Sequence, residues 1–270
     1  MYSYILPAAI SLPLGYNCRI SLPMSAIKER MNKKIDRFNI TFSIIAYREG
    51  EVFFEKKISL NEKTKDSVEI DIPDQKNFSD KSGFAELEIL ENDKKLIFGS
   101  RLTLSFYSIF FSDNKKSFLS DNAYKYGSPS VINQMSSIKR YLDAYPTVTI
   151  DKNKDLGETL VLINPYPKKI FASIVTYDKR TINGVLVNPY SSKEVSLSQL
   201  LNVHEKNWEG HIQIKAKNRL ITFIYKHSLK DNRLISDYEH LDPFRGDPTC
   251  IALTQLLRNK IGDFFKSFAN

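Results

Sequence analysis

Apolar and polar residues alternate along most of this 270-residue chain with a period of two, which is typical of β-strands with one buried face. In the first half such segments cover 39–47, 52–58, 67–72, 84–90 and 95–107. In the second half they cover 159–163, 169–177, 184–187, 193–197, 211–215 and 220–226. Breaks that carry Asn, Asp or Gly separate them, as in hairpin turns. Short strands at this spacing favour antiparallel sandwiches over a parallel α/β sheet.

The strand pattern occurs twice in the same order. The matched segments are 18–23 with 160–165, 43–48 with 173–178, 83–89 with 210–216, and 95–98 with 219–222. An internal repeat of this size sets the architecture before any motif is considered. We therefore predict an all-β fold of two tandem antiparallel β-sandwich domains related by internal duplication, with a helical connector and a C-terminal amphipathic helix.

The repeat also predicts the division of the chain into domains. The expected segments are a first sandwich over 1–111 with a short helical insertion near 25–34, a partly helical connector over 112–157, a second sandwich over 158–235, and a turn-rich loop and helix over 236–270. In the connector, Ser128-Pro129 precedes apolar residues at helical spacing that continue to Tyr141-Leu142. Such a helix is expected to pack against the sandwiches.

The C-terminal helix has the clearest helical pattern. Asp247-Pro248 forms a good N-cap and first turn. The apolar stripe of this candidate docking helix consists of Leu253, Leu257, Ile261, Phe264 and Phe265. We expect it to dock on the protein's own core or on another subunit. Peripheral contact with a membrane surface is the alternative, because cationic residues flank the stripe.

Composition and charge narrow the class of protein. A hydrophobic fraction of 42% and an aromatic fraction of 12% indicate a folded chain. The net charge of +8 comes from dispersed lysine clusters, whereas nucleic-acid binding needs a concentrated basic stripe, so we do not expect that function. Cys18 and Cys250 lie too far apart for a metal or redox motif. No signal peptide or transmembrane run is recognisable, and the expected location is the cytoplasm.

The stretch 238–248 is the densest in reactive side chains. His240 and Asp242 have the spacing of an iron-binding pair, but no second histidine follows them, so we predict no metal site. As a ligand loop, His240, Asp242 and Arg245 would converge on a sugar or a carboxylate. As structure, the same residues would form a tight strand-to-helix turn, for which Asp, Pro and Gly are typical.

Three aromatic residues form a second candidate site. Tyr166 and Tyr190 follow near-duplicate Asn-Pro turns, and Trp208 is the single tryptophan. Such a platform stacks a sugar ring or grips a peptide. Alternatively, each tyrosine packs over its own proline turn.

The second repeat also resembles a known family. Residues 158–164 (ETLVLIN), 173–178 (SIVTYD), 187–200 and the closing strand to 225 are similar to the sensory rhodopsin transducer family, over about 158–233. Members of that family are small soluble β-sandwich proteins that assemble as oligomers and are associated with a membrane photoreceptor. The resemblance implies a sandwich fold and a partner-binding role, and it transfers no site residues.

Together these observations favour a non-enzymatic binding or adaptor protein that acts through protein–protein contacts and self-associates. Its protein partner is not identified by the sequence. The alternative is a carbohydrate-recognising β-sandwich module with a glycan ligand, and the second alternative is an enzyme with a site around 238–248. No nucleophile elbow, phosphate loop or dinucleotide motif is present, and we predict neither catalytic residues nor a cofactor.

Overall fold

The computed structural model describes residues 8–13, 15–23, 39–61, 63–64, 66–73, 82–92, 107–111, 117–120, 124–125, 141–144, 146–176, 181–202, 207–216, 220–231 and 239–240. In these residues the fold is predominantly β, and every strand pair is antiparallel. The single helix of this part of the chain, α3 (Leu197–Leu200), has one turn. The all-β prediction is therefore confirmed.

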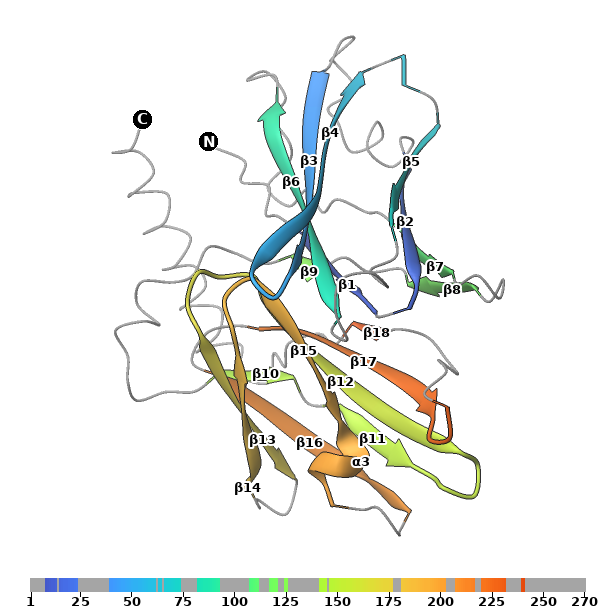
Figure 1. Ribbon diagram of the computed structural model, residues 1–270, viewed down its shortest axis with the longest axis vertical. Coiled ribbons are helices and arrows are strands. Elements are labelled where there is room, and N and C mark those ends of the chain that lie inside the picture. Colours follow the sequence, from blue (N-terminus) through green and yellow to red (C-terminus); the bar gives the residue numbers. More distant parts are fainter. Residues whose placement is uncertain are drawn as a thin grey trace, which may run out of the picture.

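Two sheets form the N-terminal half (Figure 1). One has the strand order β4 (Glu51–Asn61), β3 (Asn39–Arg48), β6 (Gly83–Asn92), β1 (Ala8–Leu12), β9 (Tyr124–Lys125). The other has the order β5 (Ser67–Ile72), β2 (Asn17–Pro23), β7 (Tyr107–Phe111), β8 (Ser117–Ser120). Along β2 buried and half-buried residues alternate, as the sequence pattern predicts for a strand with one buried face.

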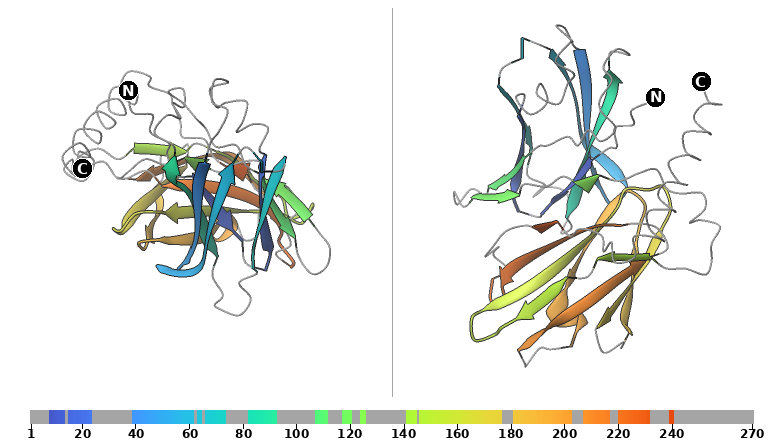
Figure 2. Two further views of the ribbon diagram at one scale, coloured as in Figure 1. Left: turned by 90° about the horizontal axis from the view of Figure 1, so that it is seen from above. Right: turned by 180° about the vertical axis from the view of Figure 1, so that it is seen from behind.

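Two further sheets form the C-terminal half, which lies below the N-terminal half in Figure 1 and in the rear view of Figure 2. One has the order β10 (Tyr141–Ala144), β16 (Trp208–Ala216), β13 (Ile170–Thr176), β14 (Thr181–Val187), and β11 (Thr147–Ile150) also pairs with β16. The other has the order β15 (Ser191–Ser196), β12 (Leu156–Asn164), β17 (Ile221–Ser228), β18 (Glu239–His240).

Strand order and register correspond between the halves. β3 lies between β4 and β6 and β2 lies between β5 and β7, while β13 lies between β14 and β16 and β12 lies between β15 and β17. Ile44 is opposite Leu87, and Ile174 is opposite Ile214. These are the residues that the matched segments 43–48 with 173–178 and 83–89 with 210–216 make equivalent.

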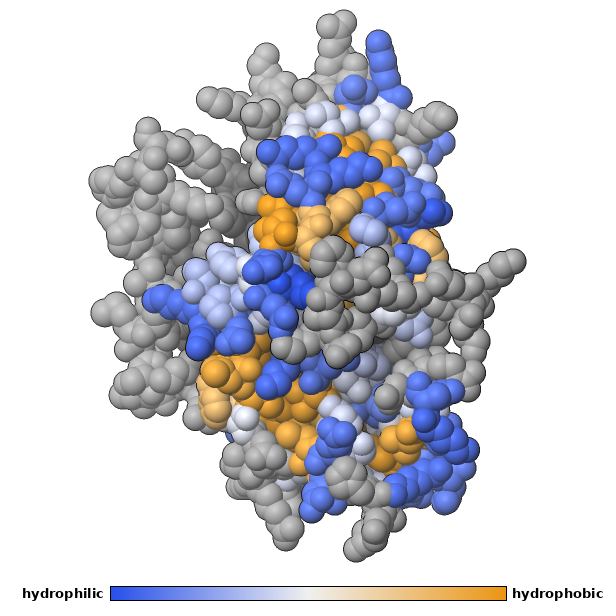
Figure 3. Space-filling view, viewed as in Figure 1, coloured by the Kyte–Doolittle hydropathy of each residue, from blue (hydrophilic) through white to orange (hydrophobic). Residues whose placement is uncertain are grey.

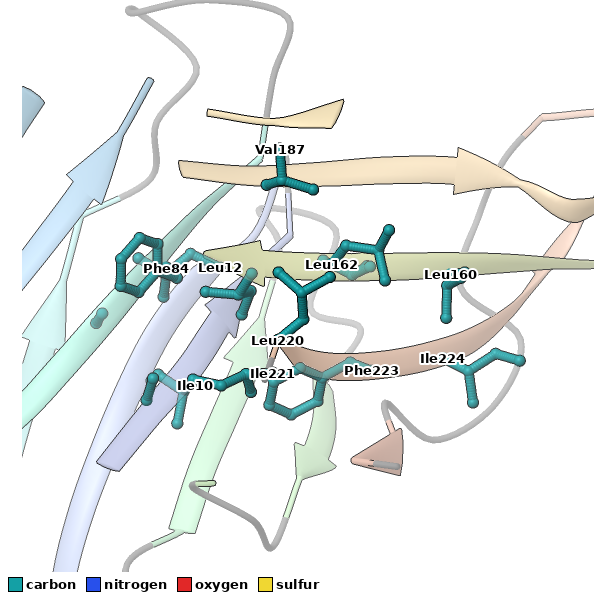
Figure 4. Close-up of a cluster of buried hydrophobic side chains, with 14 of the residues drawn as sticks. Ile10, Leu12, Phe84, Leu160, Leu162, Val187, Leu220, Ile221, Phe223 and Ile224 are labelled. Atoms are coloured by element: carbon teal, nitrogen blue, oxygen red, sulfur yellow. The ribbon is translucent and has the colours of Figure 1, made fainter. Parts of the chain in front are cut away.

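The buried apolar side chains form one cluster that extends through both halves. In β12, residues 160–163 (LVLI) are all fully buried, so both faces of this strand are covered. One face packs within the C-terminal half and the other faces the N-terminal half. Figure 4 shows the residues of this contact, among them Ile10, Leu12 and Phe84 from one half and Ile221 and Phe223 from the other. We call the contact between the halves the seam.

Some predicted elements differ from the structure or lie outside it. Tyr141 and Leu142, assigned to a connector helix, belong to β10, because they pair with Ala216 and Lys215 of β16. β15 ends at Ser196, and Leu197 begins α3 instead of ending a strand. The helices predicted near 25–34 and within 236–270 lie outside the described residues. No helix among the described residues is long and apolar enough to cross a membrane.

Candidate functional site

Asn164 joins the two Asn-Pro turns of the C-terminal half. Its side chain is fully buried at the end of β12, and its Nδ2 donates to the carbonyl oxygens of Lys168 at 2.7 Å, Val187 at 3.2 Å and Asn188 at 2.9 Å. Its Oδ1 accepts from the backbone N–H of Tyr166 at 3.1 Å. All these partners are backbone groups, so this amide fixes both turns in place.

Tyr190 carries the second turn across the seam. Its φ of 46° places it in the left-handed region, and its carbonyl oxygen accepts from the backbone N–H of Gly50 at 3.1 Å. Its ring stacks on Tyr47 with the centroids 5.4 Å apart, and Tyr47 stacks on Phe84 at 5.1 Å. Aromatic pairs at these separations are stabilising beyond the area they bury. The turn of β14–β15 is therefore docked on the turn of β3–β4.

Polar contacts continue the seam beside this stack. The Oγ atoms of Ser82 and Ser192 lie 3.0 Å apart, and Ser192 Oγ donates to the Ser82 carbonyl oxygen at 2.8 Å. Tyr225 OH donates to Glu194 Oε2 at 3.1 Å. Because Ser192 and Glu194 are two residues apart on β15, both project toward the N-terminal half.

The local environment shifts two acid groups at the seam. Glu194 is exposed as a residue, but neighbouring protein atoms partly desolvate its carboxylate. This desolvation raises its pKa, against hydrogen bonds from Tyr225 and Ser82 that lower it. The pKa of Tyr225 is raised first by burial and then by the nearby Glu194 carboxylate. Tyr225 therefore stays protonated beside Glu194 and donates a hydrogen bond to it, because a tyrosinate there would be a second anion.

A pocket of about 300 Å³ opens at this point of the seam. Both halves line it, with Glu49, Ser82, Leu186, Ser192, Lys193 and Glu194 among its residues. It offers hydroxyls, carboxylates and an ammonium group beside an apolar wall. We refer to it as the seam pocket.

The edge of the neighbouring sheet is the second candidate surface. Among the described strands, β14 pairs only with β13, and no described strand pairs with its other edge. Phe171 and Leu186 are opposite one another in this pair, and each is 46% exposed. The Phe171 ring lies over Gly184. Figure 3 shows apolar surface over this part of the C-terminal half.

The three predicted platform residues do not lie on one surface. Tyr166 is buried, and Tyr190 stacks within the seam. Trp208 starts β16 opposite Ile150, beside the turn that leads into β12, whereas Asn164 ends β12. Trp208 is thus at the other end of the C-terminal half from the two tyrosines.

Little of the predicted 238–248 site falls within the described residues. His240 belongs to β18 and is opposite Phe223, while Asp242 and Arg245 lie outside the described part. The docking helix with Leu253, Leu257, Ile261, Phe264 and Phe265 lies outside it as well. Among the residues that are described, no three His, Cys, Asp or Glu side chains are grouped to hold a metal ion.

No protein-family model matches the chain, and a search of curated proteins found no match. The resemblance of 158–233 to the sensory rhodopsin transducer family stays a prediction.

Sequence reasoning did not find the seam pocket or the β14 edge. The pocket unites Ser82 and Ser192, which are 110 residues apart and carry no motif. The edge did leave a signal. Val185, Leu186 and Val187 are consecutive apolar residues. A strand with one covered face buries alternate residues, here Val185 and Val187, so the apolar Leu186 is left on the other face.

Proposed function

We propose that this protein is a non-enzymatic binding protein that captures an extended segment of a protein partner along β14. The observation that carries the proposal is the absence of charged residues from this seven-residue edge strand. Natural edge strands are commonly protected from pairing by charged side chains. An open edge without that protection is suited to adding a strand from another chain.

The corresponding edge of the other half supports this proposal. β4 and β14 occupy equivalent places in the two strand orders. β4 carries Glu51, Glu55, Lys56 and Lys57, whereas β14 reads TINGVLV. We infer that the halves arose by duplication, which the matching registers support, and that the second half then acquired a binding edge. The equivalent β4 edge kept its charges.

The chemistry around β14 indicates an acidic partner segment. Neither β13 nor β14 contains an acidic residue. Lys168 and Lys169 are exposed just before β13, at the end where Ile170 is opposite Val187. Lys215 lies on the outer face of the same sheet, opposite Ser173. A segment with alternating apolar residues and flanking Asp or Glu would pair with the backbone, cover Leu186 and meet these lysines.

A fluorescein-labelled decapeptide in which valine alternates with glutamate tests this proposal. Fluorescence anisotropy is expected to show saturable binding that weakens with added salt, since the lysines are exposed. The same peptide with lysine in place of glutamate is expected not to bind. Phe171→Glu should lower the affinity at least about tenfold, because it removes an apolar contact and adds a repelling charge.

Val52→Glu is the matched control, because Val52 is 53% exposed on the charged edge β4. Circular dichroism verifies that each variant is folded, and Phe171→Ser replaces Phe171→Glu if the latter unfolds. Equal loss of binding in Val52→Glu, or no binding of the glutamate peptide to the wild type, contradicts the proposal.

A further inference from the structure

The seam pocket lies at the end of β14, which contributes Leu186 and Val187 to its lining, and it has features of a ligand site. Residues from both halves line it, and contacts between the halves fix its position. We propose that the seam pocket binds a small neutral polyhydroxylated ligand of monosaccharide size, and that the bound ligand holds the two halves together.

The two-sided chemistry of the pocket fits such a ligand. Leu186 and Val187 provide an apolar wall, and Ser82, Ser192 and Glu194 provide polar groups. A sugar ring likewise has an apolar face and a rim of hydroxyls. Ligand sites of this kind commonly combine apolar lining with a few placed polar groups, and they start at roughly 300 Å³.

The hydrogen-bonding capacity of the pocket matches hydroxyl groups. Glu194 accepts bonds from Tyr225 and Ser82, and a carboxylate has about four acceptor positions, so it can accept further donors. Lys193 forms no ion pair with another described residue, and its ammonium group offers three donors. A hydroxyl both donates and accepts, so adjacent hydroxyls of one ring can bond Glu194 and Ser192, whose side chains project to the same side of β15.

The charges of the pocket disfavour strongly charged ligands. Glu49 and Glu194 would repel an anion, and Lys193 would repel a cation. Glu194 lines the pocket and accepts a bond from Tyr225, so a ligand hydroxyl can donate to the same carboxylate. A neutral ligand gains these bonds without facing a like charge.

Isothermal titration calorimetry and thermal unfolding with glucose, galactose, mannose and N-acetylglucosamine test the inference. At least one sugar is expected to bind saturably and to raise the melting temperature with concentration, because it binds only the folded state. Sodium phosphate and putrescine, as an anion and a dication, are expected not to bind. Glu194→Gln and Ser192→Ala should each weaken the binding of the sugar about tenfold or more.

Glu209→Gln and Ser59→Ala are the matched controls, since both residues are on other strands and do not line the pocket. They should leave sugar binding unchanged. Phe171→Glu should also leave it unchanged, which separates this inference from the proposed function. No saturable sugar binding, equal weakening by the control variants, or preferential binding of phosphate or putrescine would overturn the inference.

Discussion

Asn164 illustrates how a single side chain determines the local structure. The sequence showed two Asn-Pro-Tyr turns and suggested that each presents a tyrosine. In the structure Asn164 makes four hydrogen bonds, two of which reach Val187 and Asn188 in the second turn. It is 0% exposed, so water cannot replace these bonds. The first Asn therefore holds both turns, and Tyr190 gains its fixed position at the seam.

Asn164→Ala is expected to lower the free energy of unfolding by about 3 kcal/mol, because it leaves several buried backbone groups without a partner. Urea unfolding followed by circular dichroism measures this change. Asn207→Ala is the control, since Asn207 is exposed and accepts one bond from Lys152 at 3.0 Å. It should cost less than about 1 kcal/mol, and a similar cost for both variants would contradict the role given to Asn164.

At the scale of elements, strand type follows from how many faces are covered. β2 alternates because one face is buried, whereas β12 is apolar on both faces because two layers cover it. Glycine occurs on β12 and β14 where a neighbouring side chain packs directly against the strand backbone. At Gly157 on β12 a Cβ would lie 2.5 Å from Leu229 Cδ2 and 2.9 Å from His227 Cε1. At Gly184 on β14 it would meet the half-exposed Phe171 ring.

These two glycines should respond differently to the same substitution. Gly157→Ala is expected to cost about 2 kcal/mol, because buried His227 has no room to move. Gly184→Ala should cost less than about 1 kcal/mol, since the exposed ring of Phe171 can rotate toward solvent. Chemical denaturation of both variants gives the comparison. If Gly184→Ala were the more costly, the Phe171 ring would have to be fixed by contacts as tight as those at Gly157.

The whole molecule is organised by the seam. One sheet, β15-β12-β17-β18, contributes to the interior of the C-terminal half and also faces the N-terminal half. Apolar burial on both sides is worth roughly 1.5–3 kcal/mol for each large side chain. The Tyr190–Tyr47 stack and the Ser82–Ser192 contact add specific pairing at the rim. We therefore expect the halves to unfold together.

Phe84→Ala tests this coupling. Phe84 is in β6 of the N-terminal half and is 0% exposed, so its truncation should cost roughly 3–5 kcal/mol. Trp208, the single tryptophan, reports on the C-terminal half. Its fluorescence transition should shift to lower urea together with the circular dichroism transition. An unshifted tryptophan transition in this variant would show that the halves unfold independently.

Prediction from sequence succeeded where short-range patterns suffice. The period of two located most of the strands, and 67–72 coincides with β5. The short matched segments also anticipated equivalent strand pairs, such as Ile44 with Leu87 and Ile174 with Ile214. The predicted connector helix was wrong at Tyr141 and Leu142. Their apolar spacing is near-helical, but in the fold they pair with β16. Prediction from sequence also placed Trp208 with Tyr190, because distance along the chain does not show which end of a strand a residue occupies.

The sequence by itself determined an antiparallel β fold with a repeated strand pattern, because alternation and turn residues act locally. Only the tertiary structure decided that β12 is covered on both faces, that β14 is an edge among the described strands, and that Ser82 and Glu194 share a pocket. Each of these depends on which distant segments meet. A local pattern records whether a side chain prefers burial, but it does not record what buries it.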